Sequence, residues 1–120
     1  MVSSVLLVDD DPAFLILAAR IFDSVGIEVV ATAPDAAAAV TAAETTRPES
    51  ALVDVGLPDR NGIDLAYELA ALPWEPRVVV TSTDRDAASV IAARDGARKL
   101  PFVPKEELAA GPLLRLLAAE

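Results

Sequence analysis

The stretch "VLLVDDDP", residues 5–12, joins a short apolar segment directly to three acidic residues and a proline. Four consecutive apolar residues are typical of a strand that is buried on both faces, as in a parallel sheet. The carboxylates of Asp9, Asp10 and Asp11 then crowd one end of that strand. Two such charges about 4 Å apart repel by about 4 kcal/mol at an effective dielectric of about 20, so something must offset this repulsion.

Short apolar segments rich in Val, Ile and Leu recur along the chain and alternate with segments of helical pattern. The predicted strands span residues 4–8, 27–31, 51–55, 77–82 and 99–103. The predicted helices span residues 12–25, 35–44, 62–72, 84–97 and 112–120. Five strand–helix repeats predict an α/β fold: a three-layer, doubly wound domain around a five-stranded parallel sheet with right-handed crossovers. The length of 120 residues fits one such domain, residues 1–120.

The first predicted helix carries clear start and stop signals. Pro12 suits the first helical position, and Gly26 suits the stop. Asp11 directly precedes Pro12, so we expect it to be the N-cap of this helix rather than a metal ligand. We expect the buried face of the helix to be formed by Phe14, Leu17, Ala18, Ile21 and Val25. The third predicted helix has the same spacing of apolar residues, at Ile63, Leu65, Ala66 and Leu69.

Composition excludes several classes of function. The formal net charge is −9, with 10 Lys and Arg against 19 Asp and Glu, which argues against direct binding to a nucleic-acid backbone. The absence of Cys and His excludes disulfides, thiolate and imidazole metal ligands, Ser-His catalysis and a phosphohistidine. No signal peptide is visible, and no apolar segment approaches the roughly 20 residues that cross a bilayer. We therefore expect a cytoplasmic protein without membrane contact.

Polar side chains occur where the predicted strands end, which is where open α/β sheets form their sites. Asp9 and Asp10 follow the first strand, and Asp54 lies near the end of the third. Thr81 lies at the end of the fourth strand, and Lys105 follows the fifth. A cluster of carboxylates suits a hard cation such as Mg²⁺. We therefore expect a bound divalent cation to offset the repulsion between the carboxylates that follow the first strand.

Three of these residues also have a purely structural interpretation. Asp54 fits a carboxylate that caps a loop or pairs with Lys105. Thr81 fits a hydroxyl that is satisfied at the end of a strand, and Lys105 fits a solvated surface lysine. Each structural interpretation is reasonable for a single residue, and only the set of residues favours a functional site.

The segment "DVGLPDRNG", residues 54–62, is predicted to be a loop that follows the third strand. Pro58 and the Asn61-Gly62 pair are its turn signals. Because this loop starts at Asp54, we expect it to bring the backbone carbonyl of Gly56 within reach of the same metal.

Four motifs together resemble the receiver domain of two-component response regulators in their order and spacing. They are "VLLVDDDP", "LVDVGLPDRNG", "VVVTS" and "FVPK". The resemblance covers essentially all 120 residues and implies a flavodoxin-like fold with strand order 2-1-3-4-5. It also implies that Asp54 is the phosphoacceptor and that Mg²⁺ is the cofactor.

The resemblance further implies a role for each of the remaining site residues. Asp10 is expected to bind the metal directly and Asp9 largely through water, with Asp54 and the carbonyl of Gly56 as further ligands. Thr81 would be the switch hydroxyl, and Lys105 the lysine that neutralises the phosphoryl oxygens. Phe102, three residues before Lys105, matches the aromatic residue that moves with the switch.

The function implied by the resemblance is Mg²⁺-dependent transfer of a phosphoryl group to Asp54 from a sensor histidine kinase or a phosphotransfer protein. Such a chain is not an enzyme but a signalling phosphoacceptor that assists its own phosphorylation and dephosphorylation. Phosphorylation is expected to alter a face on the fourth helix, fifth strand and fifth helix. That face would bind an output protein or a second copy of the chain, and it lies around residues 86–95, 99–103 and 112–119. The start Met and the last helix favour a stand-alone receiver.

Two other functions fit part of the pattern. A degenerate receiver would act only as a constitutive interaction module, although every site residue is present here. A phosphatase of the haloacid-dehalogenase type also uses an Asp nucleophile and Mg²⁺, but it requires an acid two residues after that Asp. Gly56 stands two residues after Asp54, which argues against this class. Nucleotide binding lacks its glycine-rich motifs.

Three features depart from the receiver pattern. Gly56 and Thr83 occupy two positions at which many receivers carry side chains that influence the lifetime of the phosphoryl group. The segment from Gly96 to Lys105 looks longer than usual. Glu106 follows Lys105 where the family usually has a proline. A cis bond without proline costs about 3–4 kcal/mol, so we expect the Lys105–Glu106 bond to be trans.

Overall fold

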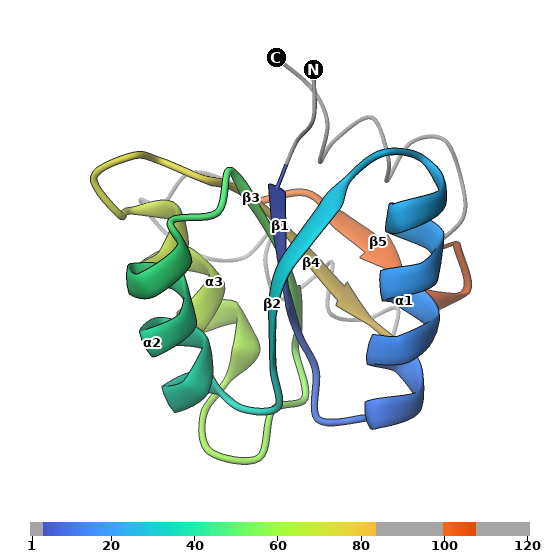
Figure 1. Ribbon diagram of the computed structural model, residues 1–120. Helices are drawn as coiled ribbons and strands as arrows, with labels where there is room; N and C mark the ends of the chain where they lie inside the picture. The colour runs from blue at the N-terminus through green and yellow to red at the C-terminus, as the bar shows by residue number, and fades with distance from the viewer. Residues whose placement is uncertain (1–3, 84–99, 108–120) are drawn as a thin grey trace.

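A computed structural model of the protein describes residues 4–83 and 100–107 and shows an α/β fold around a parallel five-stranded sheet (Figure 1). The strands are β1 (Ser4–Val8), β2 (Glu28–Ala33), β3 (Ser50–Asp54), β4 (Arg77–Ser82) and β5 (Phe102–Pro104). The helices are α1 (Pro12–Ser24), α2 (Ala36–Thr46), α3 (Gly62–Ala70) and the 3₁₀ helix η1 (Lys105–Glu107). The strand order is β2-β1-β3-β4-β5, so the predicted order is confirmed. The helices predicted over 84–97 and 112–120 lie outside the described residues.

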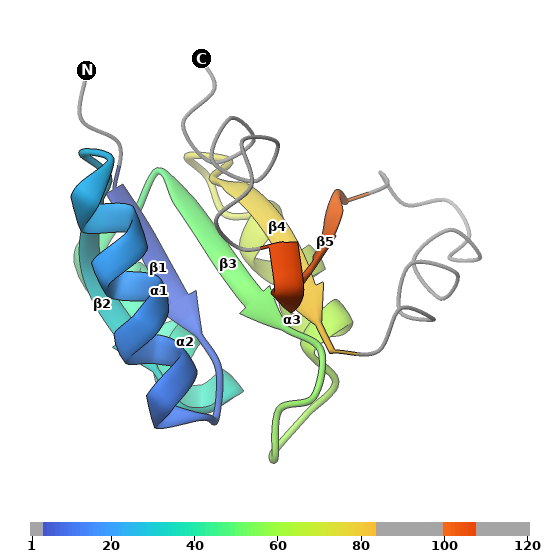
Figure 2. The same ribbon diagram turned by 90° about the vertical axis from the view of Figure 1, so that its right-hand side faces the viewer.

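Helices cover both faces of the sheet. Helices α2 and α3 pack on one face and α1 packs on the other, as Figures 1 and 2 show from two directions. Residues of β1 alternate between the two sides: Leu6 and Val8 join the core under α2 and α3, whereas Val5 and Leu7 join the core under α1. All four side chains are buried, as the continuous apolar segment predicts.

The buried face of α1 differs from the predicted one. The residues of this helix that are fully buried are Ala18 and Phe22, whereas Leu17 and Val25 are 53% and 50% exposed. Phe14, Ala18 and Ile21 do belong to the core side, as predicted. Apolar residues fill most positions in the middle of α1, so helical spacing alone allows more than one apolar stripe. The stripe that contacts the sheet therefore overlaps the predicted one but includes Phe22 in place of Leu17 and Val25.

Three strands have boundaries that differ from the prediction. β3 spans Ser50–Asp54 rather than residues 51–55. The starts of β2 and β5 differ for local reasons. β2 starts at Glu28 rather than residue 27, because the N–H of Ile27 donates to Phe22 O (2.9 Å) and closes the end of α1. β5 starts only at Phe102, since Pro101 has no N–H to give to a sheet ladder. The carbonyl of Pro101 still accepts from Val80 N–H (2.9 Å). The predicted strand 99–103 is therefore a shorter strand, placed later.

The helix termini agree well with their sequence signals. Asp11 is the N-cap of α1 and accepts from the N–H of Ala13 (3.0 Å), and Pro12 is the first helical residue. Gly26 follows the end of α1 with φ of +83°, a conformation that favours glycine. Asn61, predicted only as part of a turn, is the N-cap of α3 and accepts from Ile63 N–H (2.7 Å).

Two expectations about the chain as a whole can be compared with the described residues. No cis peptide bond occurs in this part of the chain, so the Lys105–Glu106 bond is trans, as predicted. None of the described helices has both the length and the apolar character that a membrane span needs.

Candidate functional site

The register of the parallel strands brings the predicted site residues to one edge of the sheet. Val8 of β1 pairs with Val53 of β3, so the residues that follow them, Asp9 and Asp54, lie at neighbouring strand ends. Asp54 in turn pairs with Thr81 of β4. One register of backbone pairing therefore places side chains from distant parts of the chain side by side.

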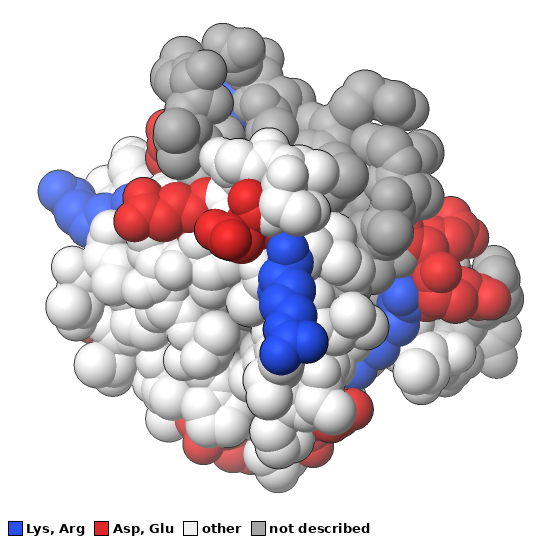
Figure 3. Space-filling view, turned by 45° about the vertical axis from the view of Figure 1, so that its right-hand side comes forward, with Lys and Arg blue, Asp and Glu red and all other residues white. Residues whose placement is uncertain are grey.

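Three carboxylates meet at this edge. Each of Asp9, Asp10 and Asp54 offers one carboxylate oxygen, and these oxygens all lie within 4.8 Å of one another. Asp9 and Asp54 are buried, whereas Asp10 is exposed. Figure 3 shows several groups of acidic side chains on this face, and one group lies at the lower edge, where β1 and β3 end in Figure 1. The site thus has two buried carboxylates and one that faces solvent.

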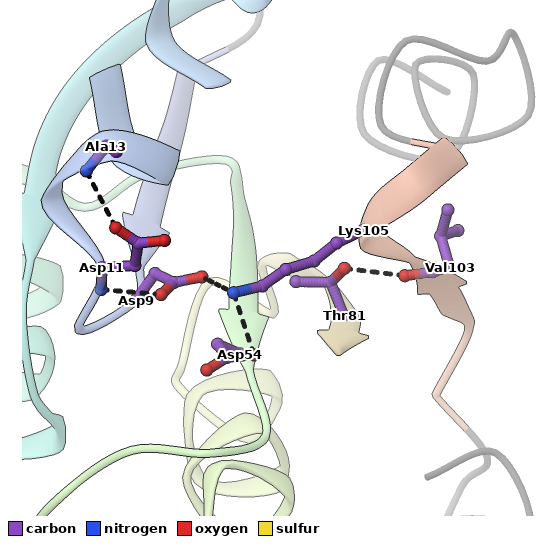
Figure 4. Close-up of polar contacts among 7 residues, drawn as sticks. All are labelled: Asp9, Asp11, Ala13, Asp54, Thr81, Val103 and Lys105. Atoms are coloured by element: carbon purple, nitrogen blue, oxygen red, sulfur yellow. Dashed lines mark hydrogen bonds and ion pairs between the residues drawn. The ribbon is translucent and has the colours of Figure 1, made fainter. Parts of the chain in front are cut away.

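Lys105 reaches into this group from the end of β5 (Figure 4). Its Nζ lies 2.6 Å from Asp9 Oδ2 and 3.5 Å from Asp54 Oδ1. The same ammonium lies 4.4 Å from the centre of the Phe14 ring of α1, a cation–π contact. Lys105 is therefore a half-buried side chain that links three strands and a helix, and not the solvated lysine of the structural interpretation.

The pKa values of this group follow from burial and mutual charge. Burial raises the pKa of the Asp54 carboxyl, the Asp9 charge raises it further, and Lys105 partly offsets both. Burial alone would lower the pKa of Lys105, but the contacts with Asp9 and Asp54 outweigh it and hold that pKa above its ordinary value. Lys105 is consequently held in its protonated form. Its single positive charge does not fully offset the burial of Asp54 and the negative charge of Asp9.

Asp9 shows that the site suits a hard cation. Its Oδ1 accepts from the N–H of Asp11 (2.9 Å), so the side chain is held in place by the turn that follows β1. Its Oδ2 is buried and accepts no hydrogen bond of good geometry, although Lys105 Nζ lies close to it. A buried carboxylate oxygen with spare acceptor capacity, beside two further carboxylates, fits Mg²⁺, which binds oxygen ligands.

Thr81 is buried and directs its hydroxyl away from Asp54. Its Oγ1 donates to the carbonyl of Val103 in β5 (2.7 Å), as Figure 4 shows. The structural interpretation of Thr81, a satisfied hydroxyl at a strand end, therefore describes this conformation. Phe102, the predicted switch aromatic, is half-buried and packs against the core under α2 and α3.

The loop from Asp54 to Gly62 folds back onto the end of β3. The N–H of Gly62 donates to the carbonyl of Val55 (2.9 Å). A Cβ atom on Gly62 would lie 1.9 Å from the backbone oxygen of Asp54, so only glycine fits there. A Cβ atom on Gly56 would instead lie 3.6 Å from Asp54 Oδ2, which is ordinary contact. Gly56 thus lies next to the Asp54 carboxylate, and a small side chain at this position would contact that carboxylate without a clash.

Three contacts in or near this site were not predicted from the sequence. Phe14 was predicted only as a core residue, although it also contacts Lys105. Gly62 was predicted only as part of a turn, because a close approach of two backbone segments leaves no local signal. Asp59 was not singled out, yet its carboxylate accepts from the N–H groups of Ala36 (2.9 Å) and Ala37 (3.0 Å) at the start of α2.

Comparison with known proteins agrees with this geometry. The family model of the response regulator receiver domain matches residues 5–108. The chain belongs to this family. Receiver domains are signalling phosphoacceptors that generally bind Mg²⁺ at an acidic pocket, and the group formed by Asp9, Asp10 and Asp54 corresponds to such a pocket.

Individual receiver proteins resemble this chain over most of its length. It is 33% identical over 126 residues to the transcriptional regulatory protein PdtaR of Mycobacterium tuberculosis, covering 97% of this chain and 60% of PdtaR. It is 33% identical over 108 residues to the DNA-binding response regulator MtrA of Mycolicibacterium smegmatis, covering 88% of this chain and 47% of MtrA. The chain thus spans about half the length of the curated relatives that it matches, and DNA binding is a property of MtrA as a whole.

The solved structures show the same receiver fold. The response regulator domain of Thermotoga maritima CheB superposes with a TM-score of 0.77 at 29% identity, covering 97% of this chain and 94% of that domain. The CheY-like receiver domain of Methanospirillum hungatei superposes with a TM-score of 0.75 at 25% identity, with coverage of 97% and 94%. The flavodoxin-like fold predicted from the sequence is therefore confirmed.

Proposed function

We propose that Asp54 accepts a phosphoryl group from a phosphohistidine of a sensor histidine kinase or phosphotransfer protein, and that this receiver transmits the signal to an output partner. The observation that supports the proposal is the position of the Asp54 carboxylate. It lies 3.5 Å from the Lys105 ammonium, which also contacts Asp9, and one of its oxygens lies within 4.8 Å of oxygens of Asp9 and Asp10. The proposed receiver domain covers residues 1–120, and its direct partners are proteins and not nucleic acid.

The proposed step is an in-line displacement at phosphorus. An oxygen of the Asp54 carboxylate forms the new P–O bond, the P–N bond to the donor imidazole breaks, and the imidazole leaves with the electron pair of that bond. Reactions of this kind are accelerated mainly by positioning and by stabilising charge. Lys105, with Nζ 3.5 Å from Asp54 Oδ1, is placed to neutralise the incoming phosphoryl oxygens.

The metal in this proposal is Mg²⁺. Asp10 would bind it directly and Asp9 largely through water, with Asp54 and the backbone carbonyl of Gly56 as the other ligands from the chain. When bound, the ion supplies positive charge that offsets the phosphoryl group and the neighbouring carboxylates. Asp9 is held for this task by the N–H of Asp11, and its buried Oδ2 has capacity left for a ligand.

The proposed switch begins at Thr81. Its hydroxyl would leave the carbonyl of Val103 and donate to a phosphoryl oxygen on Asp54, its neighbour across the β3–β4 pair. The side chain of Phe102, half-buried on β5, would then move inward. The output face proposed around residues 86–95, 99–103 and 112–119 lies mostly outside the described residues.

The proposal is tested by the mass of the intact protein after incubation with acetyl phosphate. We expect the wild-type chain to gain the mass of one phosphoryl group with Mg²⁺, and none when a chelator removes the metal. The Asp54→Asn variant should gain none under either condition. A full gain of mass in Asp54→Asn would contradict the proposal. So would a gain of mass in the wild type that is the same with and without the chelator.

A matched pair of variants tests the metal ligands. Asp10→Asn should weaken Mg²⁺ binding, measured by calorimetry, more than Asp11→Asn does, because the Asp11 carboxylate is occupied as the N-cap of α1. Equal losses in the two variants would show that the roles of these neighbouring residues are assigned wrongly.

A further inference from the structure

We propose that Asp59 is a positioning residue that holds the loop after β3 in the shape that the metal site needs. The inference rests on the proposed function, because it concerns the same Mg²⁺ site. Asp59 lies in the loop between Asp54 and Gly62, but its side chain does not contact the site. It acts on the N-terminus of α2, more than twenty residues earlier in the sequence.

Both carboxylate oxygens of Asp59 are used. Oδ1 accepts from Ala36 N–H (2.9 Å) and Oδ2 accepts from Ala37 N–H (3.0 Å). These two N–H groups begin α2 and have no partner inside the helix, and the positive end of the helix dipole adds to the attraction. The pKa of Asp59 is lowered, first by the Ala36 hydrogen bond and also by the Ala37 bond, so the carboxylate is ionised at neutral pH.

The helix has its own N-cap, so Asp59 is not needed simply to start it. Asp35 is that N-cap, and it accepts from the N–H of Ala38 (2.8 Å). The first three N–H groups of α2 are thus divided between one local carboxylate and one carboxylate from a distant loop. This division indicates that the Asp59 contact serves the loop as well as the helix.

The contact fixes the part of the loop that carries Gly56. At one end of this part, the N–H of Val55 donates to Thr81 O of β4 (3.1 Å). At the other end, Asp59 is fixed on α2. Gly56 lies in the short segment between these two anchors, and its carbonyl is the proposed backbone ligand of the metal. Within this segment the N–H of Leu57 donates to Val55 O (3.1 Å) and closes a tight turn at Gly56. A loop released at Asp59 would keep that local bond but would hold the Gly56 carbonyl less firmly against the site, since glycine has high conformational freedom.

The next residue anchors the loop to a different helix. Arg60 forms an ion pair with Glu68 of α3 (2.7 Å), and both side chains are exposed. An exposed pair of this kind contributes little. Asp59 is exposed as well, but its carboxylate accepts two hydrogen bonds from backbone N–H groups, so it is the stronger of these two anchors.

The experiment compares Asp59→Ala with Asp35→Ala, because both variants remove a carboxylate from the same helix terminus. Mg²⁺ alone is titrated into each variant of the 120-residue chain in a calorimeter, and the thermal midpoint is measured without metal. We expect both variants to lose thermal stability, but only Asp59→Ala to bind Mg²⁺ about tenfold more weakly, the effect of losing an outer-shell support. The Mg²⁺ affinity of Asp59→Asn, which keeps one acceptor oxygen, should lie between the affinities of wild type and Asp59→Ala.

Hydrogen exchange of the metal-free protein provides a second measurement. The amide of Gly62, bonded to Val55 O, should exchange faster in Asp59→Ala than in Asp35→Ala, because only the former releases the loop. Unchanged Mg²⁺ affinity in Asp59→Ala, or an equal loss of affinity in Asp35→Ala, would overturn the positioning role. If the wild type binds Mg²⁺ but acetyl phosphate does not label it, the proposed function fails while the positioning role stands. A wild type that binds no Mg²⁺ would overturn both.

Discussion

At the scale of single residues, Asp54 shows how a binding site costs stability. Burial raises the pKa of its carboxyl, so the ionised form is less favourable in the folded chain than in the unfolded chain. The folded state therefore holds a proton that the unfolded state loses as pH rises above the ordinary value of 3.8. The stability linked to this proton is present below that pH and is lost as pH rises through the raised pKa.

We predict that Asp54→Asn raises the free energy of unfolding at neutral pH when no Mg²⁺ is present, because it removes a buried charge beside Asp9. This gain in the free energy of unfolding should disappear as pH falls toward 3.8, because the Asp54 carboxyl of the wild type is then protonated in the folded state. Added Mg²⁺ should favour the wild type instead, by about 2.7 kcal/mol at about 100 times its Kd. Urea titrations with and without metal measure both effects, and a variant that is less stable than wild type without metal at neutral pH would contradict this account.

The two glycines of the loop after β3 differ in what they allow. We predict that Gly62→Ala destabilises the protein by about 1–3 kcal/mol or more, because the added Cβ overlaps the backbone of Asp54. Gly56→Ala is the matched control, since its Cβ meets only ordinary contact, and it should leave stability nearly unchanged. Thermal unfolding of the two variants checks the prediction, and equal midpoints would show that the close approach at Gly62 is not a constraint.

At the scale of elements, α1 shows where a sequence pattern is ambiguous. Its middle is apolar on several sides, so the predicted face included Leu17 and omitted Phe22. The structure buries Phe22 completely and leaves Leu17 half exposed. We predict a loss of about 3–5 kcal/mol for Phe22→Ala and a change within about 0.5 kcal/mol for Leu17→Ala. Chemical denaturation measures both losses. A larger loss for Leu17→Ala than for Phe22→Ala would support the buried face predicted from the sequence.

The pair β4–β5 is the element that transmits the proposed signal. Because Thr81 bonds to Val103 of β5, its movement toward a phosphoryl group would change the environment of that strand. We predict that beryllofluoride with Mg²⁺ shifts the backbone resonances of 100–107 in the wild type, and much less in Thr81→Ala. Asp54 remains intact in this variant, so acetyl phosphate should still label it. Full shifts in Thr81→Ala would show that the signal does not pass through this hydroxyl.

At the scale of the whole molecule, the sequence predicted features that depend on local pattern. Strand-ending carboxylates, the N-cap at Asp11 and the αL stop at Gly26 all leave signals within a few residues. The strand order was implied by the family resemblance, and the structure and its relatives agree with it.

The features that the sequence did not predict depend on contacts between distant segments. Asp59 caps a helix that starts 23 residues earlier, and Phe14 meets a lysine from the other end of the chain. The direction of the Thr81 hydroxyl depends on where β5 lies, which no local pattern specifies. Such contacts arise only once the sheet has formed, because its register decides which residues meet.

The central claim is that one carboxylate among several at this edge of the sheet accepts the phosphoryl group. The most direct test locates the modification after treatment with acetyl phosphate and Mg²⁺, by borohydride reduction of the acyl phosphate and tandem mass spectrometry of the peptides. The account predicts that reduction converts Asp54 alone to homoserine, and that Asp9, Asp10 and Asp11 remain unmodified. Modification at any of those three residues, or none at Asp54, would contradict it.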